Sequence, residues 1–237
     1  MLTARVAQFR ARLYDKTISD PEVILNKAIE LDGVFVELFT TRLPPQWEYV
    51  TMYTDQNSDL IWNGRYHIYY DYWISQVWNG MRTARIMLNL TIRDTLLEGF
   101  SCKPPRFTGL EHSAQFQLST DTLFEMQADI LYTVPQHLGY LPTITSNQYS
   151  SNAAESSIRL PWTQFSDENK DGFPILRMSG PYLLLWPLWF TGILNIATDE
   201  LKQYVIRNLR TMGETMGIQQ ANVLAHVIES EKGITVW

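Results

Sequence analysis

Apolar residues recur at steps of three or four along several segments of the chain, which is the spacing of one face of an α-helix. The longest such stripe consists of Ile74, Val77, Met81, Ala84, Leu88, Ile92 and Leu96. Asp71 stands where a helix needs an N-terminal capping side chain, and Gly99 is a natural helix terminator. The pattern predicts a long helix between these two residues, with its apolar stripe buried and Trp78 packed nearby.

The first third of the chain carries a second stripe, formed by Val23, Ile24, Ala28, Ile29 and Leu31. Ser19 or Asp20 can cap a helix here, and Pro21 fits its first position. Pro44 and Pro45 then stop whatever precedes them, because proline lacks the amide donor that a helix requires. The first segment is therefore predicted to be helical, and the polar stretch at 56–64 is predicted to be a turn.

The middle of the chain combines one further helix with two loops. Prolines 104 and 105 and Gly109 make Cys102–Ser119 a predicted loop. A helix is predicted from about Thr120, and Pro135 must kink or end it. The face of this helix consists of Leu123, Gln127, Ile130, Val134 and Leu138. Tyr140–Gly172 is rich in Ser, Asn and Asp, which predicts a long functional or mobile loop.

The last third is predicted to be helical again. Thr198 can cap a helix whose face consists of Leu201, Val205, Leu209, Met212 and Met216. Gly213 and Gly217 weaken this helix, and a new apolar face then begins at Ile218. No strand-like alternation of useful length occurs. The whole chain, residues 1–237, is therefore predicted to be a single all-α domain with at least five helices.

One stretch raises the question of a membrane span. The residues between Arg177 and Asp199 are all uncharged, and about 20 apolar residues are enough to cross a bilayer. Several Gly, Pro and Ser residues and one Asn interrupt this stretch, and no basic cluster flanks it on one side. We expect a helix buried inside a globular core and no association with a membrane.

Composition narrows the functional classes. Of the 237 residues, 45% are hydrophobic and 13% aromatic, which is ample material for a packed core. The net charge of −6 disfavours binding of nucleic acid by this chain, because affinity for phosphates depends on Lys and Arg. The single cysteine, Cys102, forms neither an internal disulfide nor a cysteine-based zinc site. The chain begins without a secretory signal, so we expect a reducing, intracellular location.

Sequence motifs for chemistry are weak. Asp167–Gly172 matches the first half of a calcium-binding loop, but position twelve is Met178 instead of the required glutamate, so a solvated turn is expected. The four histidines, His67, His112, His137 and His226, are dispersed, and each is interpreted as a surface or polar-core residue. No nucleophile or phosphate-binding motif occurs. We therefore expect no catalytic, metal or cofactor residues, and no enzyme activity.

Two further groups of residues allow alternatives. Arg82, Arg85, Asn89 and Arg93 form a polar stripe beside the apolar face of the long helix. The two arginines Arg82 and Arg85 are expected to make structural ion pairs, and the alternative is that they bind an anion or a partner segment. Six tryptophans are expected in the core, and the alternative is that they line an apolar ligand pocket. These are Trp62, Trp73, Trp78, Trp162, Trp186 and Trp189.

Several blocks taken together resemble a known family. They are AIELD at 28–32, LPPQWEY at 43–49, VWNGMRTARIMLN at 77–89, YTVPQHLG at 132–139, GFPILRMSGPYLLLWPL at 172–188 and YVIRNLRTMGETMGIQQANVLA at 204–225. In content and order they are similar to the carboxy-terminal regulatory region of fungal zinc-cluster transcription factors. The resemblance extends over residues 22–229.

This resemblance implies an all-α regulatory domain of a nuclear protein that controls transcription together with protein partners. A small-molecule effector that binds an aromatic pocket is the alternative role. The zinc cluster of the family needs six cysteines, and this chain has one. We therefore expect that the chain itself binds neither zinc nor DNA, and that it is a fragment, a truncated product or a relative without the DNA-binding module. Part of the regulatory domain before residue 28 is also expected to be missing.

Overall fold

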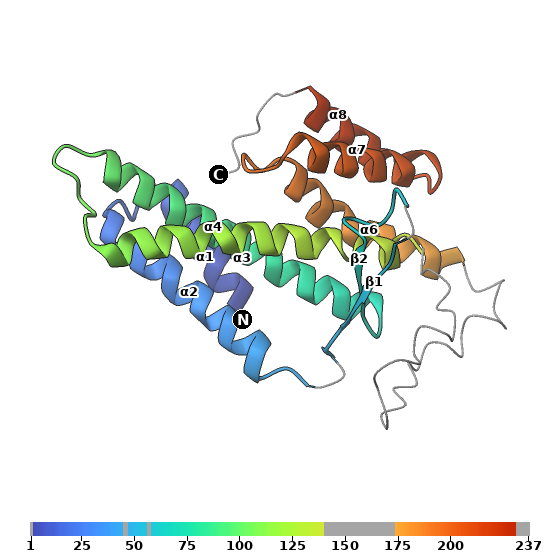
Figure 1. Ribbon diagram of the computed structural model, residues 1–237, viewed down its shortest axis with the longest axis horizontal. Coiled ribbons are helices and arrows are strands. Elements are labelled where there is room, and N and C mark those ends of the chain that lie inside the picture. Colours follow the sequence, from blue (N-terminus) through green and yellow to red (C-terminus); the bar gives the residue numbers. More distant parts are fainter. Residues whose placement is uncertain (1, 45–46, 56–57, 140–173, 231–237) are drawn as a thin grey trace.

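The computed structural model describes residues 2–44, 47–55, 58–139 and 174–230, which form helices and one small sheet (Figure 1). The helices are α1 (Leu2–Tyr14), α2 (Pro21–Thr41), α3 (Tyr72–Ser101), α4 (Leu110–Leu131), α5 (Val134–His137), α6 (Pro174–Gly192), α7 (Asp199–Glu214) and α8 (Gln219–Glu229). The two strands are β1 (Val50–Tyr53) and β2 (Arg65–Ile68). The predicted all-α, multi-helix class is confirmed.

The long helix α3 lies at the centre of the molecule and packs against α2, α4 and α6 (Figure 1). Asp71 caps it as predicted, since the Asp71 carboxylate accepts a hydrogen bond of 2.7 Å from the amide of Ile74. The predicted stripe is buried from Met81 to Leu96, whereas Val77 and Trp78 are only half-buried. Asp20 caps α2 in the same way, and Pro21 occupies its first turn.

The boundary between α3 and α4 differs from the prediction. The helix α3 continues through Gly99, which is buried, and a Cβ at this position would lie 2.1 Å from the ring of Phe107. This glycine therefore makes room for an aromatic ring instead of ending the helix. The loop is confined to residues 102–109, and α4 begins at Leu110 rather than near Thr120. The first turns of α4 are largely exposed, so no apolar stripe marked them.

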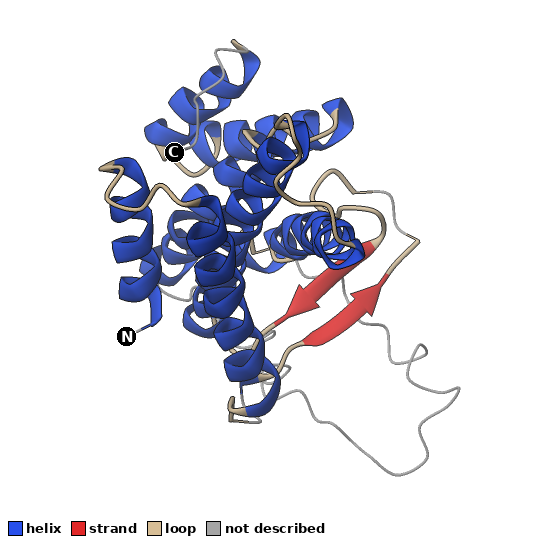
Figure 2. Cartoon of the chain, turned by 90° about the vertical axis from the view of Figure 1, so that its left-hand side faces the viewer, coloured by secondary structure: helices blue, strands red, loops and turns tan. Residues whose placement is uncertain are grey.

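The β-hairpin was not predicted. Its strands pair antiparallel, with Val50 opposite Ile68, and Figure 2 shows them beside the helices. Four residues per strand are too few for alternation to be recognised. In addition β2 does not alternate, because Tyr66, His67 and Ile68 are all buried. At the end of the turn Gly64 has a φ of +67°, a conformation that favours glycine.

Two large apolar clusters lie among the helices of the described part of the molecule, in addition to a small one in the hairpin. One lies between α1, α2, α3 and α4, and the other lies between α6, α7 and α8. The helix α6 contributes to both, through Phe190 to the first and through Leu184 and Leu188 to the second. The expectation of a core helix after Arg177 is thus confirmed. No helix among the described residues is long and apolar enough to cross a membrane.

The carboxy-terminal helices follow their predicted pattern. Thr198 caps α7 through a hydrogen bond of 3.2 Å from the amide of Leu201 to its hydroxyl oxygen. The chain passes through Gly213 in helical form and turns at Gly217, whose φ is +76°. Pro135 lies in the first turn of the short helix α5, directly after α4 has ended. The long loop predicted at 140–172 lies outside the described residues.

Candidate functional site

A buried arginine on α3 is the centre of the most unusual cluster in the molecule. The side chain of Arg82 is wholly buried, although arginine is among the residues most often found at a protein surface. The surrounding residues come from the hairpin, the segments beside it, α3 and α4. We call this group the Arg82 cluster, and it consists of Tyr49, Arg65, His67, Tyr69, Trp78, Asn79, Arg82, Asp129 and Tyr132.

Both ionic and aromatic contacts stabilise the Arg82 guanidinium. Its Nη2 lies 3.4 Å from a carboxylate oxygen of Asp129, and its Nη1 donates a hydrogen bond of 3.1 Å to Asn79. Its central carbon lies 5.3 Å from the ring centroid of Tyr49 and 5.4 Å from that of Trp78, within the range of cation–π attraction. Burial raises the pKa of Asp129, and the positive charge of Arg82 acts against that increase.

Rings and backbone bonds connect the hairpin to the turn between α4 and α5. The His67 ring lies 4.4 Å from that of Tyr49, centroid to centroid, and the amide of His67 donates to the carbonyl of Tyr132 at 2.8 Å. The side-chain amide of Gln136 forms two hydrogen bonds of 2.9 Å with the backbone of Tyr69. The hairpin is therefore held by hydrogen bonds as well as by its small apolar cluster.

Two histidines in this region are buried and neutral. Burial lowers the pKa of His67 to about 2 and that of His137 to about 4. The Nδ1 of His137 donates to the carbonyl of Gly180 at 2.8 Å, so its Nε2 accepts from the Ser75 hydroxyl, also at 2.8 Å. The interpretation as polar-core histidines is confirmed for this pair, whereas His226 is exposed.

The Ser75–His137 pair has the spacing of a nucleophile and its general base. Both side chains are buried, however, with exposures of 0% for Ser75 and 1% for His137. The imidazole is oriented by a backbone carbonyl, and a Cβ on Gly180 would lie 2.5 Å from the carbonyl oxygen of His137. Helices α3, α5 and α6 therefore meet here in close contact. The pair connects these helices and is not accessible to a substrate.

The side chains of the predicted polar stripe on α3 contact different parts of the molecule and do not form one site. Arg82 reaches Asp129, and Arg85 forms a bidentate pair with Asp32 of α2 at 2.8 and 3.1 Å. Arg93 donates to Asn195 at 3.1 Å, and the Asn89 amide donates to a backbone carbonyl on α3 itself. The expectation that Arg82 and Arg85 make structural ion pairs is confirmed.

The tryptophans are distributed over the molecule. Trp62 packs on Tyr204 with ring centroids 5.0 Å apart, and Trp186 and Trp189 contact each other on α6 at 5.8 Å. Trp73 and Trp186 are 66% and 52% exposed, so the expectation that they lie in the core is wrong. They occupy outward positions near the start of α3 and along α6. Trp162 lies outside the described residues. The described tryptophans do not meet in a common pocket.

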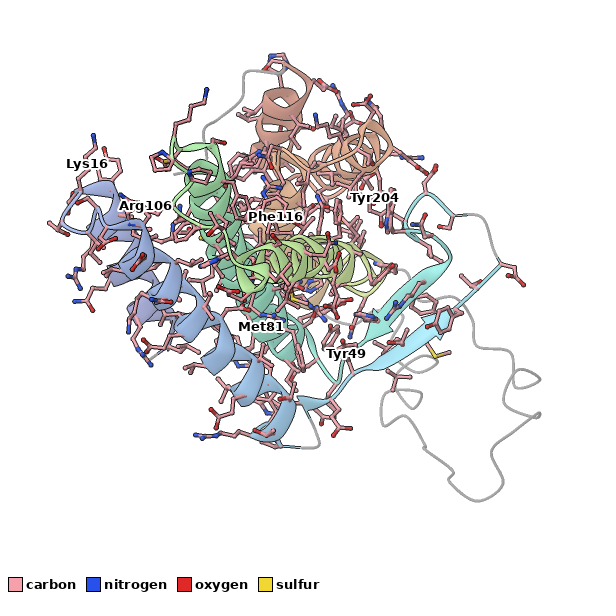
Figure 3. The ribbon with its side chains drawn as sticks, turned by 60° about the vertical axis from the view of Figure 1, so that its left-hand side comes forward. Lys16, Tyr49, Met81, Arg106, Phe116 and Tyr204 are labelled. Carbon is pink, nitrogen blue, oxygen red and sulfur yellow. The ribbon has the colours of Figure 1, made fainter. Side chains whose placement is uncertain are left out.

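Open clefts adjoin two of the aromatic groups. One of about 420 Å³ lies between the hairpin loop and α7, where Trp62 and Tyr204 stand among mainly polar residues, and Figure 3 shows Tyr204 facing that loop. Another of about 200 Å³ lies beside the Arg82 cluster. Its lining residues are Phe39, Thr40, Leu43, Glu48, Tyr49 and Trp78.

Three of the blocks that carry the family resemblance meet at the Arg82 cluster. The first block, residues 43–49, supplies Tyr49, and its Trp47 carbonyl accepts a hydrogen bond of 2.8 Å from the Trp78 indole. The second block, 77–89, supplies the Trp78, Asn79 and Arg82 side chains. The third block, 132–139, supplies Tyr132, whose ring contacts that of His67 in an edge-to-face arrangement. Residues far apart in sequence thus become neighbours.

Sequence reasoning missed part of this cluster. The dispersed histidine pattern presents His67 as an isolated residue, and no motif draws attention to Tyr69 or Asp129. A signal was present, because the stretch from Arg65 to Tyr72 contains five aromatic rings or imidazoles and one β-branched residue, a composition that favours a strand.

Metal sites have little support in the described part of the chain, where no group of three or more His, Cys, Asp and Glu side chains is arranged to hold an ion. Cys102 is exposed and free. The half-motif for calcium at Asp167–Gly172 lies outside the described residues, so its status as a solvated turn stays a prediction.

Comparison with known proteins gives no match: no family model, no curated protein and no solved structure is significantly similar to this chain.

Proposed function

We propose that this chain is a regulatory and protein-interaction domain of a fungal, zinc-cluster type transcription regulator, that it acts in the nucleus, and that it performs no chemistry of its own. The resemblance of its sequence blocks to that family is the starting point. The observation that supports it most is that three of those blocks converge on one buried ion pair, Arg82–Asp129. Sequence blocks that meet at one structural centre support the family resemblance more strongly than blocks that are scattered over the surface would.

The packing of the Arg82 cluster is more typical of a domain that binds protein partners than of one that catalyses a reaction. The one serine–histidine pair noted above is enclosed among three helices. The Arg82 cluster contacts the hairpin and α4, and Ser75 and His137 extend the connections to α6. A partner that binds the hairpin would therefore contact the same packed unit as one that binds α6.

The role in transcription is testable by fusing the chain to an unrelated DNA-binding domain and measuring a reporter gene in yeast. We expect reporter activity to differ from that of the DNA-binding domain alone, and Arg82→Met to abolish the difference. Arg210→Met is the matched control, since Arg210 forms an exposed pair with Glu229. A fusion without effect on the reporter would contradict the proposal.

The expectation about nucleic acid and zinc is tested on the purified chain. We expect no sequence-selective binding in a titration with duplex DNA at low salt, because the net charge is −6. We expect zinc below one equivalent in the same sample, because structural zinc needs about four ligands per ion. Stoichiometric zinc, or selective binding that weakens steeply with salt, would show that the chain retains a DNA-binding function.

A role as a small-molecule sensor is the second candidate, and the cleft lined by Phe39, Tyr49 and Trp78 is the observation that favours it. Two of these rings also contact the Arg82 guanidinium, so a ligand there would touch residues of the cluster. A ligand that binds only the native state raises the melting temperature. A thermal-melt screen of small metabolites, in which Phe39→Leu removes any shift, would identify such a ligand.

A further inference from the structure

The cleft beside the Arg82 cluster has the size of a site for a small group. Its volume is about 200 Å³, below the roughly 300 Å³ at which sites for drug-sized ligands begin. The end of α2 provides one wall, the approach to β1 provides the second, and Trp78 of α3 provides the third. Figure 3 shows Tyr49 where the chain enters the hairpin. The cleft is therefore built from three segments held together by the fold.

Its aromatic rings meet at steep angles. Phe39 and Trp78 have centroids 5.0 Å apart and an interplanar angle of 65°, and Tyr49 and Trp78 are also 5.0 Å apart at 87°. The Trp78 indole is fixed by its hydrogen bond to the Trp47 carbonyl. Rings that meet in this way form a corner, in which a bound group contacts more than one ring at once.

The charge of the cleft is negative. Glu48 lines it, and this carboxylate makes no ion pair or hydrogen bond with the described part of the chain. The hydroxyl of Thr40 is already used, because it donates to the carbonyl of Val36 at 2.7 Å. None of the described residues that line the cleft is basic. A cation with an apolar surface therefore complements it, and an anion does not.

The buried positive charge of Arg82 does not prevent this. Arg82 is wholly buried and is not among the lining residues, whereas Tyr49 and Trp78 line the cleft and also contact the guanidinium. The two rings therefore stand between Arg82 and the cleft. In addition, Asp129 lies 3.4 Å from Arg82 and balances its charge.

We propose that this cleft binds a quaternary ammonium group, through the rings of Phe39, Tyr49 and Trp78 and the charge of Glu48. Aromatic rings attract such cations through their quadrupole, and the methyl groups of the cation fill apolar space. The group is carried by a free metabolite of the choline type or by a trimethylated lysine side chain. This proposal rests on the second candidate function, since it names the ligand class of the same cleft, and it does not depend on the role in transcription.

The first test is isothermal titration of the full chain with choline chloride and with 3,3-dimethyl-1-butanol, the uncharged carbon analogue of choline. Shape and apolar area are nearly the same in both, so the difference reports the charge. We expect choline to bind at least about tenfold more tightly. Equal or tighter binding of the alcohol, or no heat from choline at millimolar concentration, would overturn the proposal.

The second test uses variants whose fold is checked by their unliganded melting temperatures. Glu48→Gln should weaken choline binding about threefold or more at low salt, with a smaller effect at high salt. Phe39→Leu should weaken it as well, because leucine keeps apolar volume and removes a ring face. Glu98→Gln, an exposed carboxylate on α3, is the control and should change nothing. Choline affinity that is unchanged in both cleft variants would overturn the assignment to this cleft.

The third test identifies the source of the group. Nα-acetyl-trimethyllysine amide is compared with choline and with the unmethylated lysine amide. Tighter binding of the trimethyllysine compound assigns the cleft to a protein side chain, and tighter binding of choline assigns it to a free metabolite. Either result supports the proposal provided that the unmethylated amide binds at least about tenfold more weakly. Equal binding of methylated and unmethylated lysine would overturn it.

Discussion

Two regions of the molecule are stabilised in different ways. One is the unit formed by helices α7 and α8, and the other is the Arg82 cluster. The α7–α8 unit is mainly apolar, and its two helices are neighbours in sequence that pack against α6. The Arg82 cluster is built from charges, an imidazole and rings, and its contacts join residues far apart in sequence, such as Arg82 with Asp129 and His67 with Tyr132.

This difference has an energetic meaning. Apolar burial is roughly proportional to area and does not depend on direction, so the α7–α8 unit tolerates changes that conserve volume. A buried ion pair gains little over a well-packed apolar pair, yet the loss of one partner leaves an uncompensated charge. The Arg82 cluster should therefore be the more sensitive of the two regions to single substitutions, and a paired substitution there should be less harmful.

The largest effect is expected from Arg82→Ala. We expect a loss of about 3–5 kcal/mol in the free energy of unfolding, because Asp129 would stay buried without its partner. The double variant Arg82→Met with Asp129→Leu should recover a substantial part of that loss. Urea denaturation measures both. A loss below about 1 kcal/mol for Arg82→Ala would mean that the pair is not buried as described.

In the α7–α8 unit, Leu209→Ala should cost about 2–5 kcal/mol, since Leu209 is fully buried in the second apolar cluster. The matched control is Val223→Ala on α8, where the side chain is 62% exposed and the change should stay within about 0.5 kcal/mol. Equal effects of the two substitutions in urea denaturation would show that α8 packs against the rest of the molecule through a different face, so that Val223 is not exposed.

Acid should act on the polar region through its buried histidines. The native pKa of His137 is about 4, whereas that of an unfolded histidine is about 6.5. The unfolded state therefore binds more protons below about pH 6.5, and stability falls as the pH decreases toward 4. Between pH 6.5 and 5 we expect His137 to account for a loss of about 1–2 kcal/mol.

His137→Gln should reduce this pH dependence, and His226→Gln, the same change at an exposed position, is the matched comparison. The comparison requires unfolding curves at several pH values above 5, where most carboxylates are still largely ionised. His67 has a native pKa of about 2 and contributes with the same sign. An identical slope in His137→Gln and the wild type would contradict the description of His137 as buried and neutral.

The smallest effect is expected at the surface of the α7–α8 unit. Arg210 forms a bidentate pair with Glu229 that joins the two helices, but both side chains are substantially exposed. We expect Arg210→Ala to lower the free energy of unfolding less than Arg82→Ala or Leu209→Ala, and the loss to decrease further in high salt, because an exposed ion pair is screened. A larger loss than that of Leu209→Ala would reverse the comparison between apolar and ionic contributions.

Much of the fold was predictable because helix periodicity and helix capping are local. The stripe from Met81 to Leu96 and the capping residues Asp20, Asp71 and Thr198 were identified from the sequence and are confirmed. The errors occur where local rules give way to tertiary contact. Gly99 was interpreted as a terminator, but it is required by the ring of Phe107, which comes from another segment.

The candidate site was predictable only in part. The sequence indicated that Arg82 and Arg85 form ion pairs within the domain, but it did not identify their partners. Asp32 lies 53 positions before Arg85 in the chain, and no periodic pattern connects them. The sequence by itself determined the helices, their caps and their apolar faces, since these depend on residues within a few positions of one another. The tertiary structure alone decided that the hairpin forms and that Arg82 faces inward to Asp129. It also decided that Tyr49 and Trp78 share a cleft. Each of these contacts requires distant segments of the chain to pack together.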